Sequence, residues 1–324
     1  MKFLVLFLAI LLQQQIPRKR SWGGRRFFER WMTMLEATLA VNRWADGWRF
    51  LVAVIIPAVL VSVGFWLLGS VAWGLPAFAG EILLLLALLS QANVGRSLRQ
   101  YRDCLGTGDV QGAWFCAEQA IALPESALSD EAESMNRQVL QAVMYRWFEY
   151  FFLIVFWYVV ADVAGVILAW LTLNYVRRQQ RQGAVADDIG KTDAEEVVSE
   201  SEIEPASKPV VQPLSCIAVN CLHWLEWAPA RLLGLTYCLA GNMTLALPVW
   251  KSLLWKSAIH SQQVLDRIAS AALSVGYEGR HWHSAATDAS AAAQELEEWH
   301  QLHIRSGSVW LVVIAVATIG GWLL

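Results

Sequence analysis

The sequence predicts an all-α, polytopic helical membrane protein that carries amphipathic helices on its cytoplasmic side. Of the 324 residues, 56% are hydrophobic and only 16% are charged, a composition too apolar for a soluble domain of this length. Eighteen tryptophans also favour a bilayer, because the amphipathic indole ring settles at the headgroup level. The net charge of −3 averages a basic N-terminal part and an acidic central part.

Residues 1–178 are predicted to form an N-terminal membrane region. The run 50–69 is apolar over about the 20 residues that a helix needs to cross the hydrocarbon core, and the turn at Gly69 and Ser70 predicts a hairpin with the next apolar run. We expect four spans in this region, near residues 3–16, 50–69, 71–90 and 148–176.

The segment 17–49 carries eight Lys or Arg against three acids, interleaved with Trp and Phe. By the positive-inside rule it should lie on the cytoplasmic face of a bacterial inner membrane crossed several times by the chain. Apolar runs flank it on both sides, so the partners that it predicts are the lipid bilayer and anionic lipids, and no nucleic acid.

The apolar block 148–176 carries Asp162 and Gly165 near its middle and arginines at both ends. One straight span would place Asp162 near the bilayer centre and positive charge on both faces. Two short arms that turn at 161–165 satisfy the charge rule better. The sequence leaves both arrangements open.

The remaining segments are more polar. A cytoplasmic helical hairpin is predicted over 93–141, with Asp109 as a helix N-cap. Residues 179–213 contain eight acids, three prolines and no aromatic residue, which predicts a flexible acidic linker. The C-terminal region 214–324 should contain an amphipathic helix over 214–227, a second helix that begins near Pro229, a helix over 257–276, and a terminal apolar helix over 309–324.

Charged side chains inside apolar helices are the candidate binding residues, because each is costly there unless it meets a counter-charge or water. Arg231 suits an anion such as phosphate, although a snorkelling or ion-paired arginine is the commoner case. Asp162 is ambiguous in the same way. His300 and His303 share a helix face, but we predict no metal site, no cofactor and no catalytic residue, since no strong enzyme motif is present.

Several segments resemble the AmpE family of inner-membrane proteins. They are LEWAPARLLGLTYCLAGN from Leu225, ALPVW from Ala246 and HSQQVLDRIASAAL from His260. The P-x-R-L element and the GD-x-x-x-A pattern at Gly108 also resemble the wider superfamily of CbiB and CobD, the adenosylcobinamide-phosphate synthases. The synthases carry an E-x-x-x-E-N-like stretch where this chain has MYRWFEYFF from Met144, with Glu149 as its single carboxylate.

The AmpE resemblance implies a regulatory or sensor protein linked to β-lactamase induction and cell-wall stress, leaning away from an enzyme. A phosphorylated or cell-wall-derived small ligand and a homo-oligomer are compatible with it. The rivals are a membrane amide-forming transferase resembling CbiB and CobD, and a small-solute carrier that uses Asp162 and Arg231. The predicted ligand-binding residues are Arg231, Asp109, Glu149 and Asp162.

Overall fold

The structure is a computed structural model of the chain. It describes residues 2–15, 24–39, 45–70, 75–89, 100–101, 103–104, 107, 112, 115, 132–196, 215–273 and 289–320. All elements in these ranges are helices, so the predicted all-α fold is confirmed. Asp109 and most of the predicted hairpin 93–141 lie outside the described residues.

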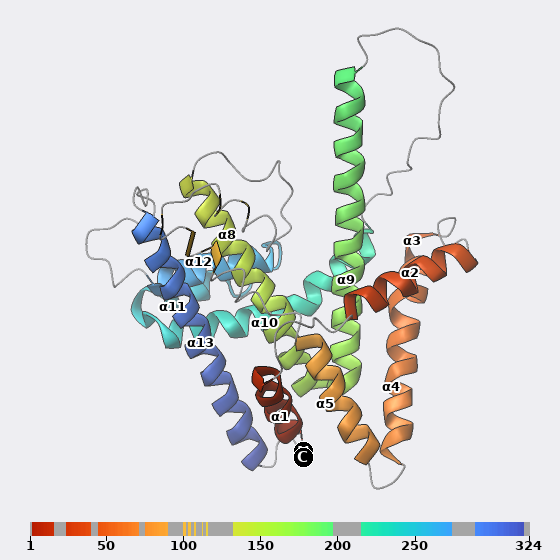
Figure 1. The fold of residues 1–324 in the computed structure, drawn as a ribbon. Helices are drawn as coiled ribbons and strands as arrows, with labels where there is room; N and C mark the ends of the chain where they lie inside the picture. The colour runs from red at the N-terminus through yellow and green to blue at the C-terminus, as the bar shows by residue number, and fades with distance from the viewer. Residues whose placement is uncertain are drawn as a thin grey trace.

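The apolar helices lie side by side, and more polar helices gather at one of their ends (Figure 1). The apolar group contains α1 (Lys2–Gln15), α4 (Ile56–Gly69), α5 (Leu75–Leu89) and the C-terminal part of α13 (Ala289–Ile319). The short helix α3 (Asp46–Phe50) and the π-helix η2 (Leu51–Ile55) precede α4 without a break. α2 (Gly24–Leu39) and α10 (Cys216–Ala240) lie across the end of this group.

Three helical stretches are long and apolar enough to cross a membrane: Asp46–Gly69, Gln138–Gly183 and Leu296–Ile319. Large apolar side chains stand exposed along them, including Leu60, Trp66, Val160, Val312 and Ile319. In water such an exposed apolar surface would drive aggregation, whereas in a bilayer it is the expected lipid-facing surface. The helical membrane protein predicted from composition is therefore what the fold shows. α1 and α5, also predicted as spans, are shorter apolar helices.

The stretch Gln138–Gly183 folds back on itself. It comprises the C-terminal part of α8 (Ala132–Trp147), the π-helix η6 (Phe148–Phe152) and the first part of α9 (Leu153–Glu196). Backbone dihedrals leave the helical region at Ala161 and at Asp162, where φ is 53° and ψ is −151°. Glu149 nonetheless pairs with Arg177, 28 residues away, which a straight helix would place about 42 Å apart. The two-arm arrangement is therefore the correct alternative, and we call residues 138–183 the central hairpin.

The turn of the central hairpin uses a backbone conformation that costs free energy for any residue with a Cβ atom. At Asp162 this cost is about 1–3 kcal/mol, and the carboxylate also forms an ion pair of 2.7 Å with Lys2 of α1. We expect Asp162→Gly to be more stable than Asp162→Ala by about 1–3 kcal/mol, the reverse of the usual order in helices. Thermal unfolding of both variants in detergent measures this difference, and equal stabilities would contradict it.

Beyond the hairpin, α9 continues to Glu196 and projects past the other helices (Figure 1). It therefore extends into the segment 179–213 predicted as a flexible linker, whose residues 197–213 lie outside the described residues. α12 (Ser261–Leu273) falls within the predicted 257–276. α13 begins 20 residues before the predicted start at residue 309, and it packs against α10 and α12.

Pro229 does not begin a helix, as the sequence had suggested, but lies inside the continuous helix α10. A proline in a helix interior leaves the carbonyl four residues earlier without its amide donor. That carbonyl belongs to Leu225, and it accepts a hydrogen bond of 3.1 Å from the indole Nε1 of Trp157 in the central hairpin. The prediction failed because the compensating donor comes from a distant part of the chain.

Candidate functional site: a buried polar network

The arms of the central hairpin are joined by buried polar groups near their open end. Glu149 is 2% exposed and forms an ion pair and hydrogen bond with Arg177 on the opposite arm. Arg177 also donates from Nη1 to the hydroxyl of Tyr150 at 2.8 Å, and its guanidinium lies 4.8 Å from the centre of that ring. A buried carboxylate with a close guanidinium needs no further counter-charge.

A second carboxylate enters the same region from α10. Glu226 is 4% exposed, and the hydroxyl of Tyr145 on α8 lies 3.0 Å and 2.9 Å from its two oxygens. Burial raises the pKa of Glu226 to about 7, against the lowering effects of the Tyr145 hydrogen bond and of the positive charge on Arg177. We call Tyr145, Glu149, Tyr150, Arg177 and Glu226 the buried polar network.

Local helix geometry explains how neighbouring residues reach one partner. Glu149 and Tyr150 lie in η6, a single π-helical stretch, and such wide turns change which side chains face a given neighbour and recur at functional sites. Here both side chains contact Arg177. The network thus ties the two arms of the central hairpin together and joins them to α10.

Arg231, the leading candidate from the sequence, is buried on α10 and donates to three backbone carbonyls. Its Nη2 lies 2.8 Å from Lys256 O, its Nη1 3.3 Å from Trp227 O and its Nε 3.4 Å from Leu254 O. Two of these carbonyls follow the end of α11 (Met243–Leu253), where orphan carbonyls accumulate. The guanidinium also stacks over the Trp227 ring at 4.9 Å. Arg231 on α10 therefore caps the C-terminal end of α11.

The guanidinium group of Arg231 should not be replaceable by lysine without a loss of stability. Arg231→Lys retains the charge but leaves one nitrogen for three carbonyls, and we expect it to cost about 2 kcal/mol or more, because hydrogen bonds to charged groups contribute about 1.5–3 kcal/mol each. Thermal unfolding in detergent measures the loss. Arg267→Lys, at an exposed position on α12, is the matched control and should change stability little. Equal effects of the two substitutions would contradict the capping role.

The structure does not bring the predicted ligand-binding residues together. Within the described residues, no hydrogen bond or ion pair joins Glu149, Asp162 and Arg231 to one another. Asp162 lies at the turn of the central hairpin, with its side chain 59% exposed and paired to Lys2, and Asp109 lies outside the described residues. A ligand site at these four residues stays a prediction.

No group of three metal-ligating side chains occurs within the part of the chain that the structure describes. His303 is buried, with Nδ1 2.6 Å from Trp299 O and Nε2 3.2 Å from the hydroxyl of Tyr237. Both nitrogens therefore have protein partners, and the ring fills space between α10 and α13.

Three members of the network, Tyr145, Tyr150 and Glu226, were not identified from the sequence. Glu226 lies in an apolar stretch, as Arg231 does, and the same cost of a charge in an apolar helix could have singled it out. Tyr145 carries no such signal, because a tyrosine beside an apolar run is ordinary at a membrane boundary.

The fold and the network define a helical membrane protein whose C-terminal helices pack on an ion-paired hairpin. Residues 205–324 match the family described as "Regulatory signalling modulator protein AmpE". The curated Protein AmpE of Shigella flexneri is 34% identical over 102 residues, which cover 32% of this chain and 32% of that protein. No solved structure matches the chain. The likeness to the synthase superfamily found no support in these comparisons.

Proposed function

We propose that the chain is a regulatory membrane protein that senses cell-wall stress and modulates β-lactamase induction. The observation that carries the proposal is the match of residues 205–324 to a family of regulatory signalling modulators. This segment contains α10 to α13, and with them Glu226 and Arg231. The 102 residues aligned with the curated relative cover 32% of that protein. The activity of the whole chain is therefore part of the proposal.

The proposed location is the bacterial inner membrane, with the polar helices in the cytoplasm. Arginines gather at the ends of the apolar helices that adjoin α2 and α10, as the positive-inside rule requires of a cytoplasmic face. By their positions in the sequence these are Arg49 in α3, Arg146 in α8, and Arg177 and Arg178 in α9. The proposed signal is a phosphorylated or cell-wall-derived small ligand on this face, and a homo-oligomer is compatible with the proposal.

The network suits a signalling role because it can adopt two charge states. Glu226 joins α10 to the central hairpin through Tyr145, and its raised pKa brings the neutral and ionised forms close in free energy near neutral pH. A ligand that favours one form would shift the packing of α10 on the hairpin.

Gene deletion in the native host tests the function. We expect β-lactamase activity after exposure to a β-lactam inducer to change on deletion and to return with a plasmid copy of the wild-type chain. Unchanged induction would contradict the proposal. Rescue of a cobalamin-assembly mutant by this chain would favour a transferase instead, and solute flux into proteoliposomes that is lost in Asp162→Asn would favour a carrier.

A further inference from the structure

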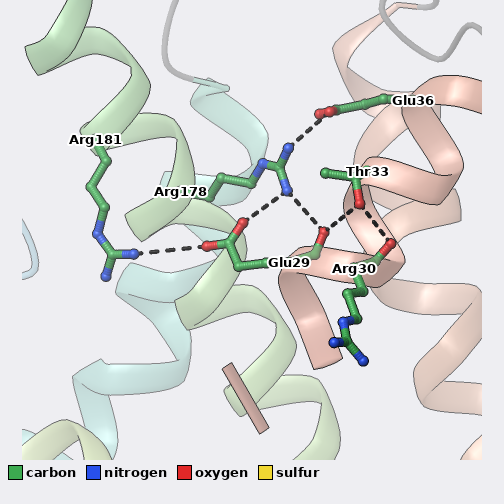
Figure 2. Close-up of polar contacts among 6 residues, drawn as sticks. All are labelled: Glu29, Arg30, Thr33, Glu36, Arg178 and Arg181. Atoms are coloured by element: carbon green, nitrogen blue, oxygen red, sulfur yellow. Dashed lines mark hydrogen bonds and ion pairs between the residues drawn. The ribbon is translucent and has the colours of Figure 1, made fainter. Parts of the chain in front are cut away.

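The acidic side chains of α2 are held against α9. Arg178, which is 9% exposed, forms ion pairs of 2.9 Å with Glu29 and 2.8 Å with Glu36, and Arg181 approaches Glu29 at 3.8 Å (Figure 2). Glu29 and Glu36 are the two acids within Gly24–Leu39. The negative charge of α2 is therefore directed toward α9 and paired there with positive charge.

The side of α2 opposite its buried residues is exposed and combines positive charge with large apolar side chains. Arg26 and Arg30 are exposed, and Phe27 and Met34 are 70% and 60% exposed. At 100° per residue these four positions fall within an arc of about 100°. Figure 2 shows the side chain of Arg30 pointing away from the ion pairs of Arg178 and Arg181 with Glu29 and Glu36, which we call the Arg178 cluster. The buried positions of the helix are Phe28, Met32 and Leu35.

The position of α2 places this face at the boundary of the apolar layer. α2 packs against α9, where Arg178 and Arg181 lie just past the apolar part of the central hairpin. It lies across the end of the apolar helices, near α3, which forms the beginning of the candidate span Asp46–Gly69 (Figure 1). In a bilayer whose hydrocarbon core surrounds the apolar helices, a helix in this position would lie at the level of the lipid headgroups.

We propose that the exposed face of α2 is a binding site for the headgroups of anionic phospholipids. Arg26 and Arg30 would hold the phosphates, since guanidinium groups bind phosphate through paired hydrogen bonds. Phe27 and Met34 would enter the boundary between headgroups and acyl chains. A soluble protein partner fits less well, because the face lies at the level where the bilayer surface itself competes for it.

The Arg178 cluster gives this site its selectivity for charge. Both acids of α2 are paired with arginines of α9, and the exposed face itself carries two arginines and no carboxylate, so anionic lipid is attracted more strongly than zwitterionic lipid. The site is independent of the proposed signalling role.

Native mass spectrometry of the full chain in detergent tests the proposal, with phosphatidylglycerol, phosphatidylcholine and inorganic phosphate titrated separately. We expect the wild type to bind phosphatidylglycerol most tightly. Arg26→Gln combined with Arg30→Gln should weaken that binding about 25-fold, at about five-fold for each arginine near an anionic surface, and leave phosphatidylcholine unchanged. Phe27→Ser combined with Met34→Ser should weaken binding of both lipids.

The matched control is Lys251→Gln combined with Arg267→Gln, which removes two positive charges from exposed positions on α11 and α12. It should bind phosphatidylglycerol as the wild type does. An equal loss in this control, an unchanged affinity in the α2 variant, or tighter binding of free phosphate than of the lipid would each overturn the proposal. If the α2 variant fails to fold, added salt must weaken phosphatidylglycerol binding by the wild type, and salt-independent binding overturns it too.

Discussion

Glu149→Gln should destabilise the protein by about 3–5 kcal/mol, because removing one partner of a buried ion pair leaves the other charge buried without compensation. Glu149 is 2% exposed and its partner Arg177 lies on the other arm of the central hairpin. The loss should therefore open the hairpin as well as lower the melting temperature. Thermal unfolding in detergent measures the first effect, and the distance between spin labels on the two arms measures the second.

Two further variants decide whether the charge itself is responsible. Glu149→Leu combined with Arg177→Met removes both charges, and we expect most of the lost stability to return, since apolar replacements of buried pairs are often neutral or better. Lys2→Gln breaks the exposed pair with Asp162 and should cost about 1 kcal/mol or less. If the double variant is as unstable as Glu149→Gln, the ion pair is not what closes the hairpin.

Composition and apolar runs predicted the helical membrane fold, because a bilayer imposes hydrophobic length directly on the sequence. The charge rule also favoured a turn near Asp162, since arginines at both ends of one block suit two arms better than a single crossing, although the sequence left both arrangements open. Span length and border charge depend on the lipid around the chain and on local sequence. Both can be identified without knowing which helices pack together.

The buried polar network could not be predicted in the same way. Glu149 was singled out in the sequence only because it is the single carboxylate where the synthases carry an E-x-x-x-E-N-like motif. Its partner Arg177 was interpreted as part of the basic border of a predicted span. The continuity of α10 through Pro229 likewise depends on Trp157, 68 residues distant along the chain from Leu225. Such pairings arise when the central hairpin folds back, and sequence periodicity carries no information about them.

The stability of the protein should fall as the pH rises from about 4.5 to about 7, and Glu226 should be the cause. Burial raises the pKa of this carboxyl from 4.5 to about 7, so the folded state holds a proton that the unfolded state releases. The stabilisation from that proton is complete below pH 4.5 and is lost as the pH passes about 7. The total change is about 3 kcal/mol, at 1.36 kcal/mol for each unit of pKa.

Comparison with Glu226→Gln isolates this effect from other titrating groups. Glutamine resembles the protonated carboxyl, so the variant should match the wild type at low pH and exceed it in stability near and above neutral pH. Tyr145→Phe removes a donor that lowers the pKa of Glu226, so in that variant the fall in stability should move to higher pH. Chemical unfolding across the pH range measures all three proteins. Parallel curves for the wild type and Glu226→Gln would show that the buried carboxyl does not titrate with folding, and the two charge states proposed for signalling would then lose their basis.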